Sequence, residues 1–567
     1  MKQRRFKLFA VLAAAVIGMG SMAGCARSQE ETAQAPSDQP ESEAGARAGG
    51  ESETGTVADD EYGKYASPIQ LSVIKLAEPG LQYDPSDPAR KSAAENIWID
   101  AYRDYLNIEV DLTAAEDEDS LNALVNTAMA NGTLPDVMVV GKEMFYSLME
   151  NEVLADISGA YETYTSTYGR QLSEVIATDS DALTTVTFDD AMYGIPRTRT
   201  KAGDSMMLWV RQDWLDEVGM EVPETIDEMT EVARAFKKAG LGGKNTIGIG
   251  IDSTVGGFSG IDGFIAAYGA VVDTWMQQED GSYVYANTTE EMKDALVALA
   301  GLYEEGLLAS DFAVSDTFGE DVANGVTGMI YHAPWYGVSG IRSSYMNDED
   351  AEWTVTVIPT LDGENVLQWG DGSIEDFIVV NKDCEHPEAV LKMLELEFHL
   401  YYEPTPEEAA KYFISGDGVN LWEYRVFKQM QRADQNYYKA ELIVEEIAND
   451  TPVEDTQEVI KSNYEQVVKG LEGDQEYKGA VDSWLYAFPI FKEKKLDLDM
   501  VRYGYNGPIT DTMSLYQTTI DEALESAALK VIMGEDISIY EKAIETWYQS
   551  GGQQITEEVN EYYHSLS

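Results

Sequence analysis

Apolar and polar residues alternate along the chain with the period of strands in some segments and of helices in others. Residues 69–74 (IQLSVI) are rich in β-branched side chains and predict a strand. Residues 226–239 predict a helix. Four more short apolar runs predict strands, at 136–140, 247–251, 353–358 and 377–380. Strands that alternate with helices indicate α/β lobes with mostly parallel sheets.

The chain after about residue 387 keeps a helical period down to residue 562. We therefore expect a helical C-terminal region. The sequence has no internal repeat and, beyond its start, no segment that suggests insertion into a membrane.

The first 24 residues have the three parts of a secretory signal peptide: a basic start, a short apolar core and a small-residue exit. The apolar run, residues 9–17, is too short to span a bilayer. Residues 21–25 (SMAGC) resemble a bacterial lipobox, although Met22 stands where leucine is usual. We therefore expect Cys25 to be lipidated, and the alternative is a signal peptide followed by an incidental cysteine.

Residues 25–66 consist mainly of Ser, Glu, Ala, Gly, Gln and Thr, with almost no large apolar side chain. Such a composition cannot bury enough surface to offset the entropy lost on ordering. We expect a disordered acidic tether that starts at the lipidated cysteine. The second cysteine, Cys384, then has no disulfide partner, so the folded part depends on its apolar core.

The chain is strongly acidic, with 102 Asp and Glu residues, 39 Lys and Arg residues and a formal net charge of −63. A field of that sign repels nucleic acid and anionic membrane surfaces, so we exclude nucleic acid as a partner. The four histidines lack the spacing of metal ligands, and we expect neither a metal site nor a cofactor.

Several segments of the chain, taken together with their order and spacing, carry a resemblance to one known family. They are 134–140 (LPDVMVV), 192–196 (MYGIP), 208–215 (LWVRQDWL), 264–270 (FIAAYGA), 328–335 (GMIYHAPW), 353–361 (WTVTVIPTL) and 551–562 (GGQQITEEVNEY). In this order and spacing, behind a lipobox, they resemble bacterial extracellular solute-binding proteins of the sugar-importer class. The branch that they resemble most is the large LplA-like lipoproteins of Gram-positive bacteria.

The resemblance implies a periplasmic-binding-protein-like fold with two α/β lobes, hinge crossovers and a solute bound between the lobes. The implied crossovers lie near residues 195–200, 329–334 and 370–376. The implied domain spans residues 67–567, with lobe 1 at about 67–195 and 335–370, and lobe 2 at about 200–330 and 376–567. We expect a monomer, lipid-anchored at the extracellular face of the cytoplasmic membrane, that delivers an oligosaccharide to the permease subunits of an ABC importer.

A sugar has C–H groups on its faces and hydroxyls at its edges, so its site needs aromatic rings together with charged or amide side chains. Residues of these types at strand ends, loops and crossovers are the candidates for ligand binding: Lys75, Glu78, Lys142, Glu143, Phe258, Asp262, Trp275, Trp335, Trp369 and Asp371. For the tryptophans the alternative is packing in the core or hinge. For the loop residues the alternative is a solvated surface position.

Arg197, Arg199 and Lys201 form a basic patch in this acidic chain, and Arg197 is a further candidate for ligand binding. The patch could bind an acidic sugar such as a uronate, because arginine pairs bidentately with carboxylates. We favour the other interpretation, in which a surface strand balances nearby aspartates such as Asp189 and Asp190.

Two other functions stay open. An importer component that binds peptides or another solute would share the fold and the anchor. A secreted glycoside hydrolase would need two carboxylates across a cleft, and a chain with 102 acidic residues always contains such a pair. Because no catalytic segment is recognisable, we expect a receptor that is not an enzyme.

Overall fold

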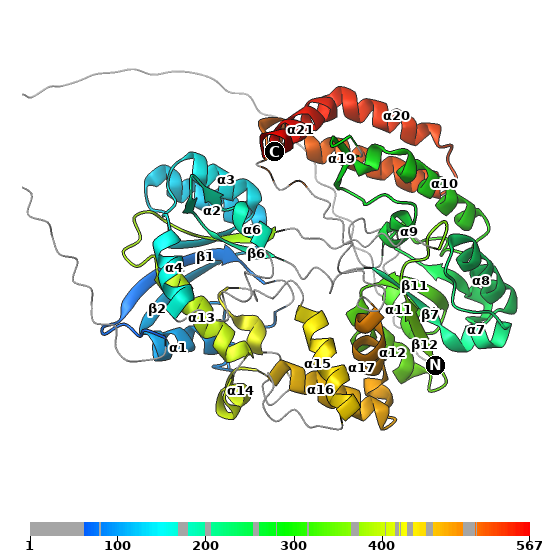
Figure 1. The fold of residues 1–567 in the computed structure, drawn as a ribbon, viewed down its shortest axis with the longest axis horizontal. Helices are drawn as coiled ribbons and strands as arrows, with labels where there is room; N and C mark the ends of the chain where they lie inside the picture. Colours follow the sequence, from blue (N-terminus) through cyan, green and yellow to red (C-terminus); the bar gives the residue numbers. More distant parts are fainter. Residues whose placement is uncertain are drawn as a thin grey trace, which may run out of the picture. The chain divides into compact units, whose positions relative to one another are not determined.

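The fold of the chain is given by a computed structural model (Figure 1). The structure describes residues 62–78, 81–167, 180–198, 206–252, 260–278, 280–314, 317–363, 374–402, 404–413, 419, 421–427, 435–449, 458–490, 505, 507 and 509–566. The described residues all belong to one compact unit, Thr56–Ser567. The predictions for the signal peptide, for Cys25 and for most of the tether lie outside the described residues.

The first main sheet has five strands in the order β2-β1-β3-β13-β6. Strands β2, β1 and β3 are parallel, whereas β13 is antiparallel to both of its neighbours. The bounds are β1 Ile69–Leu76, β2 Ile108–Ala115, β3 Val137–Val140, β6 Ile195–Thr198 and β13 Ile374–Val380.

Helices and short elements around this sheet share one hydrophobic core with it, and together they form the first lobe. Helices α2 and α3 contact strands of the sheet, and α13 contacts α4. The bounds are α1 Ile97–Ala101, η1 Tyr102–Leu106, α2 Glu118–Asn131, α3 Lys142–Glu150, α4 Ser158–Thr167, α6 Ser180–Thr184, β4 Thr187–Phe188, β5 Ala191–Met192, α13 Ala389–Tyr402, α14 Pro406–Tyr412 and η5 Leu421–Tyr424.

The second main sheet has four strands in the order β12-β7-β11-β8. Strand β11 is parallel to β8, and β7 is antiparallel to both β11 and β12. The bounds are β7 Met207–Arg211, β8 Ile247–Gly250, β11 Thr327–His332 and β12 Trp353–Thr356.

The second lobe surrounds this sheet and includes most of the C-terminal helices, with α19 packed against α10 and α20 (Figure 1). Its other elements are α7 Gln212–Val218, α8 Ile226–Ala239, η2 Gly243–Asn245, α9 Asp262–Ala267, β9 Trp275–Gln277, β10 Tyr283–Tyr285, η3 Ala286–Thr288, α10 Glu290–Glu304, α11 Phe318–Ala323, η4 Pro334–Val338, α12 Gly340–Asn347, α15 Gln435–Asn449, α16 Glu458–Leu471, η6 Gln475–Tyr477, α17 Lys478–Val481, η7 Asp482–Ala487, α19 Asp511–Ile532, α20 Ser538–Trp547, η8 Tyr548–Gly552 and α21 Gln553–Leu566.

Helix α8 shows how local sequence fixes an element. The side chain of Thr225 accepts a hydrogen bond from the backbone N–H of Glu228, and the carboxylate of Glu228 accepts one from the backbone N–H of Thr225. Both N–H groups at the start of the helix therefore have a partner. Gly240 ends the helix in the left-handed region at φ 70°, a conformation that glycine adopts without strain. The predicted helix over residues 226–239 is therefore confirmed at both ends.

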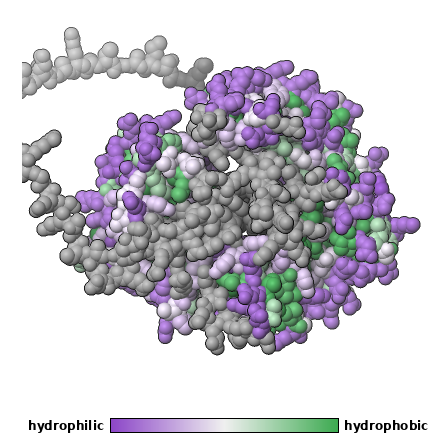
Figure 2. Space-filling model, in the orientation of Figure 1, coloured by the Kyte–Doolittle hydropathy of each residue, from purple (hydrophilic) through white to green (hydrophobic). Residues whose placement is uncertain are grey.

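The fold class is confirmed: two α/β lobes carry a helical C-terminal region. On the face drawn in Figure 2, hydrophilic residues make up much of the coloured surface, as expected for such an acidic chain. Within the described residues, no helix is both long enough and apolar enough to cross a membrane.

The predicted lobe boundaries are wrong in the second half of the chain. Strand β12 pairs with β7, so residues 335–363 belong to the second lobe, where we had expected the first. Strand β13 pairs with β3, and the core of the first lobe includes α13 and extends to Phe427. The expected crossover at 329–334 is strand β11 and the turn after it, which stay in the second lobe.

The expectation of mostly parallel sheets is also wrong. Strands β13 and β7 each run antiparallel to both of their neighbours, so both main sheets are mixed. Each of these two strands is the first in its sheet after the chain has passed over from the other sheet.

Candidate functional site

Polar side chains gather at one edge of the five-stranded sheet, where the parallel strands have their carboxyl ends. The register places Leu76 of β1 level with Val140 of β3, and Val140 pairs with Phe377 near the start of β13. Lys75, Lys142 and Arg197 therefore lie at this edge although they are far apart in sequence. Open α/β sheets bind ligands outside the carboxyl ends of their strands, so this edge is the candidate site.

Lys75 and Glu78 form an ion pair at the end of β1. The Lys75 Nζ lies 2.8 Å from Glu78 Oε1, and their side chains are only 7% and 14% exposed. The pair borders a shallow hollow that Leu112 and Ala114 of β2 also line. Both predicted residues are therefore brought together beside a depression in the surface.

Two tyrosines and an arginine complete the wall of this hollow. The rings of Tyr83 and Tyr424 lie 5.6 Å apart, edge to face, and Tyr83 is 38% exposed. Tyr424 Oη donates to the carbonyl of Gln82 over 2.5 Å, which holds the segment before Tyr83 in place. Tyr424 and Arg425 were not predicted as site residues, because they come from a segment more than 300 positions after β1.

Arg425 is buried and fixed by its neighbours. Its guanidinium carbon lies 4.9 Å from the centre of the Tyr401 ring, and Nε donates to the Trp422 carbonyl over 2.7 Å. Glu397 lies behind it, fully buried, and accepts bonds from the Tyr102 hydroxyl and the Phe427 N–H. Burial raises the pKa of Glu397 to about 7, and the nearby Arg425 opposes that rise.

Lys142 begins α3, directly after β3. Its Nζ donates to the carbonyl of Tyr505 over 2.6 Å and lies 4.8 Å from the centre of the Tyr505 ring. Burial lowers the pKa of Lys142 to about 8. The next residue, Glu143, is exposed in the first turn of the helix.

Arg197 is buried and paired with Asp376 of the neighbouring strand β13. Its Nε donates to Asp376 Oδ1 over 2.9 Å, and a second bond joins Nη2 to Oδ2. The expected surface position of Arg197 is wrong, because the side chain is buried and pairs with Asp376, which strand pairing brings close. Arg199 and Lys201 lie outside the described residues.

Trp335 lies in η4, directly after β11 of the second sheet. It is partly buried and packs against two apolar clusters of the second lobe. His332 stands beside it with ring centres 5.1 Å apart and stacks on Tyr336 at 3.5 Å. Trp335 thus belongs to an aromatic group at the carboxyl end of β11.

Two candidates lie in the core of the second lobe. Trp275 is 3% exposed and packs against Tyr285 and Trp547, so its ring has no open face for a ligand. Asp262 begins α9 and is also buried. Phe258, Trp369 and Asp371 lie outside the described residues. No group of His, Cys, Asp and Glu that could hold a metal ion occurs in the described part of the chain.

Comparisons with known proteins place the chain among binding proteins. The family model described as "Bacterial extracellular solute-binding protein" matches residues 85–396, more than half of the chain. "Lipoprotein LipO" of Bacillus subtilis (strain 168) is 25% identical over 535 residues, which cover 87% of this chain and 92% of LipO. The "Polygalacturonan/rhamnogalacturonan-binding protein YtcQ" of the same organism is 22% identical over 514 residues, with 87% and 92% covered.

A solved structure supports the fold. The S. pneumoniae "ABC-transporter substrate binding protein FusA in complex with kestose" has a TM-score of 0.56 at 14% identity and covers 88% of this chain and all of FusA. Together with the two mixed sheets, the family match over more than half of the sequence shows that the chain belongs to the bacterial extracellular solute-binding proteins.

Proposed function

We propose that the chain is an extracellular receptor that binds an oligosaccharide and delivers it to an ABC importer. The observation that carries this proposal is the edge of the five-stranded sheet, where an ion pair and a half-exposed tyrosine ring border one hollow. Charged groups exchange hydrogen bonds with sugar hydroxyls, and an aromatic ring covers the apolar face of a sugar. The names of YtcQ and of the kestose complex support a carbohydrate as the solute.

We further propose that a lipid on Cys25 holds a monomer at the outer face of the cytoplasmic membrane. The lipobox-like residues 21–25 and the similarity to a protein named as a lipoprotein support this anchor. The receptor is not an enzyme in this proposal, in keeping with the family of binding proteins to which it belongs. It leaves its sugar chemically unchanged.

The proposed ligand residues differ in their roles. Lys75 and Glu78 would contact sugar hydroxyls from the end of β1, and Lys142 would do so from the end of β3. The Trp335 ring would cover an apolar sugar face from the end of β11. Arg197 is held by two hydrogen bonds to Asp376, so we assign it to positioning the start of β13. Glu143 and Asp262 remain candidates at the starts of α3 and α9, and Phe258, Trp369 and Asp371 remain candidates from sequence alone.

Thermal unfolding of the purified full chain tests this function against a panel of neutral and acidic oligosaccharides, with short peptides as controls. A ligand at 100 times its Kd stabilises the folded state by about 2.7 kcal/mol, which shifts the transition clearly. We expect a shift with one class of oligosaccharide and complete recovery of that sugar. A shift with peptides alone would remove the sugar from the proposal, and sugar cleavage would indicate a hydrolase.

A further inference from the structure

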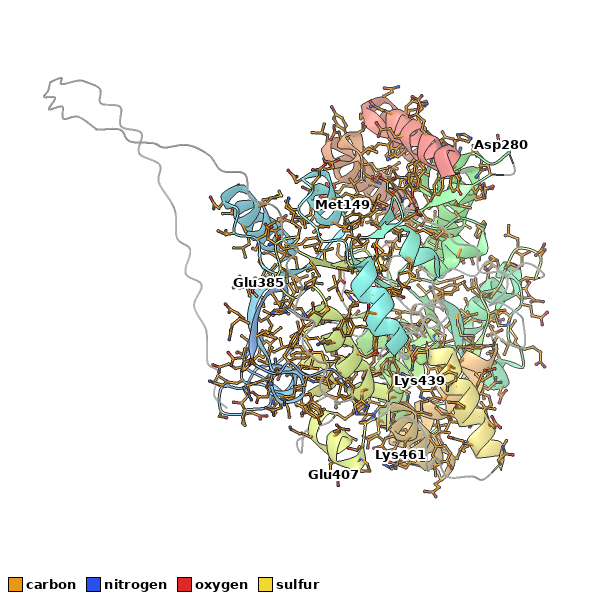
Figure 3. All side chains as sticks on the ribbon, turned by 60° about the vertical axis from the view of Figure 1, so that its left-hand side comes forward. Met149, Asp280, Glu385, Glu407, Lys439 and Lys461 are labelled. Atoms are coloured by element: carbon orange, nitrogen blue, oxygen red, sulfur yellow. The ribbon has the colours of Figure 1, made fainter. Side chains whose placement is uncertain are left out.

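The first two turns of α15 hold buried polar side chains that the fold leaves without partners. Gln435 is fully buried, and neither the oxygen nor the nitrogen of its amide has a hydrogen-bond partner in the described part of the chain. Lys439, which Figure 3 labels, lies one turn further along the same face of the helix and is 6% exposed. Buried polar groups are normally paired, so each exception needs an explanation.

Lys439 differs from the other buried cations of the described residues. The others each have a partner, which is a carboxylate for Lys75, Arg197 and Arg211 and a backbone carbonyl for Lys392 and Arg425. The chain has 102 Asp and Glu residues, yet among the described ones no carboxylate contributes to the pKa of Lys439. Burial alone lowers that pKa to about 8, so the ammonium is mostly charged at pH 7.

The start of α15 lies beside the part of the second lobe that carries Trp335. Tyr437 and Trp335 pack against one apolar cluster, and Tyr438 and Trp335 pack against another. Element η7 contacts both α15 and η4. On η7 the Ser483 hydroxyl and the Trp484 N–H are also buried without a partner within the described residues. Several hydrogen-bond donors without an acceptor therefore occur on the elements around Trp335.

We propose that Gln435 and Lys439 form a subsite for a carboxylate of the solute. This inference rests on the proposed oligosaccharide function and names a uronate as one unit of the solute. The Lys439 ammonium pairs with the carboxylate, and the Gln435 amide N–H donates to it. The first backbone N–H groups of a helix have no partner within the helix, and the helix dipole favours an anion at this end.

The unpaired charge selects an acidic unit over a neutral one. A buried ammonium without a counter-charge destabilises the folded chain, because it loses its hydration and gains no partner. A carboxylate supplies the missing charge and forms a charge-assisted hydrogen bond, which is about twice as strong as a neutral one. A sugar hydroxyl supplies no charge. A position that served packing alone would be better filled by an apolar side chain, so the charge of Lys439 points to a bound anion.

Calorimetric titration of the full chain tests the subsite with trimers of galacturonic, glucuronic and mannuronic acid, each compared with the neutral trimer of its parent hexose. We expect one uronate trimer to bind at least tenfold more tightly than its neutral counterpart. Lys439→Met should abolish that difference, and Gln435→Ala should raise the Kd of the uronate trimer at least threefold. Triglutamate serves as a second probe, in which the carboxylates belong to a peptide.

The matched control is Lys461→Met, which removes an exposed lysine from the neighbouring helix α16 and should bind the uronate trimer as the wild-type chain does. Without ligand, Lys439→Met should unfold at or above the wild-type temperature, because it removes a buried charge. A loss of binding in this variant would then not come from a loss of fold.

The results separate the subsite from the proposed function. Neutral trimers that bind as tightly as the uronates, or a Lys439→Met variant that still prefers the acid, would overturn the subsite and leave the oligosaccharide receptor standing. Binding of triglutamate alone, lost in Lys439→Met, would support the carboxylate site and overturn a sugar as the source of the carboxylate. Absence of binding by every trimer and by triglutamate would overturn the subsite, while the wider panel of oligosaccharides decides the receptor function.

Discussion

Lys439 on α15 is a buried lysine in a chain that otherwise offers an excess of carboxylates. Figure 3 labels it together with Lys461, which lies on α16 and is exposed. Burial lowers the pKa of Lys439 to about 8, because the charged ammonium loses its hydration. The folded state therefore holds this proton less firmly than the unfolded state does.

Replacing this lysine by an apolar residue should stabilise the protein. Since one pKa unit corresponds to about 1.4 kcal/mol, we expect Lys439→Met to raise the free energy of unfolding at pH 7 by roughly 1–3 kcal/mol. In the wild-type chain the unfolded state binds more protons between pH 8 and the ordinary value of 10.5, so stability should rise across that window. Lys439→Met should lose this rise.

Urea unfolding at pH 7, 8.5 and 10 measures both effects. Lys461→Met is the matched control, because Lys461 is exposed on the neighbouring helix. It should keep the wild-type dependence of stability on pH. A Lys439→Met variant that is less stable than the wild-type chain at pH 7 would show that the ammonium is compensated in the folded state.

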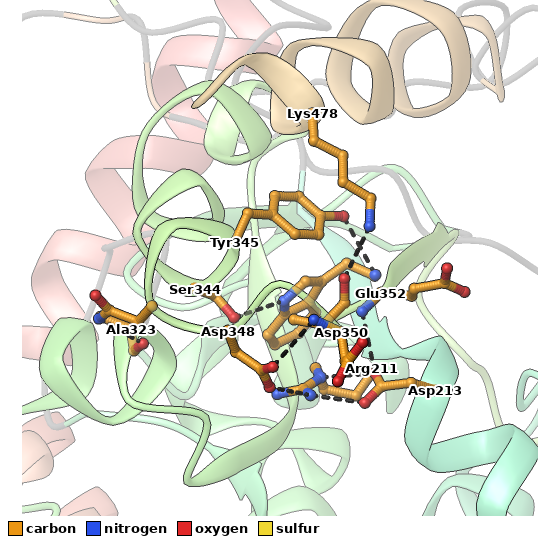
Figure 4. A network of polar contacts seen from close by, with 12 residues as sticks. Arg211, Asp213, Ala323, Ser344, Tyr345, Asp348, Asp350, Glu352 and Lys478 are labelled. Carbon is orange, nitrogen blue, oxygen red and sulfur yellow. Dashed lines mark hydrogen bonds and ion pairs between the residues drawn. The ribbon is translucent and has the colours of Figure 1, made fainter. Parts of the chain in front are cut away.

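The end of β7 is held to the loop before β12 by a polar network, shown in Figure 4. Arg211 is 2% exposed, and its Nε and Nη2 donate to the two carboxylate oxygens of Asp213, each over 2.7 Å. Asp348 approaches the same guanidinium at 3.4 Å, and Asp213 also accepts from the backbone of Glu352. This network joins the start of α7, the end of α12 and the start of β12.

Arg211→Met should destabilise the second lobe, because it removes two charge-assisted hydrogen bonds and leaves Asp213 without its main partner. Each such bond contributes about 1.5–3 kcal/mol, so we expect a loss of at least about 2 kcal/mol in the free energy of unfolding. Arg234→Met is the control. It breaks a bidentate pair with Glu305 that is 50% and 43% exposed and should cost less than about 1 kcal/mol. Equal losses in chemical unfolding would contradict this view of the network.

Element η4, which carries Trp335, meets α17 at two glycines. A Cβ on Gly479 would lie 1.9 Å from the carbonyl oxygen of Gly337, and a Cβ on Gly337 would lie 2.3 Å from that of Gly479. Real side chains do not approach backbone so closely. The two elements can therefore pack at this distance only with glycine at both positions.

Gly479→Ala should push η4 and α17 apart and disturb the support of Trp335. We expect a loss of about 1–3 kcal/mol in thermal unfolding, as is typical of overpacked contacts. Gly159→Ala within α4 is the control, since a Cβ there meets nothing within 4 Å and alanine favours helix. That variant should be as stable as the wild-type chain or more so. A Gly479→Ala chain of undiminished stability would mean that the contact is not tight.

For the molecule as a whole, the period of apolar residues predicted individual helices and strands well, but it did not predict which strands pair with one another. The strand at 69–74 and the helix at 226–239 were predicted from patterns that extend over only a few residues. The lobe that each later strand joins depends on contacts across hundreds of positions, which no local pattern encodes. For this reason β12 and β13 were assigned to the wrong lobes.

Residues of the candidate site could be predicted from the sequence only where they closely follow a predicted strand. Lys75, Glu78 and Lys142 were found because each closely follows an apolar strand. Tyr424 ends η5 and Arg425 follows it, and their contact with the end of β1 exists only in the fold. Trp275 had the right residue type, but its burial follows from packing against α20, which the sequence does not reveal.

The most direct test of the receptor function is calorimetric titration of the full chain with the oligosaccharide that stabilises it most, followed by analysis of the recovered sugar. We predict one saturable site with a micromolar Kd, equivalent to about 8 kcal/mol of binding free energy, and sugar of unchanged length after prolonged incubation. Absence of saturable heat with every oligosaccharide, or release of shorter sugars, would contradict a binding protein for oligosaccharides.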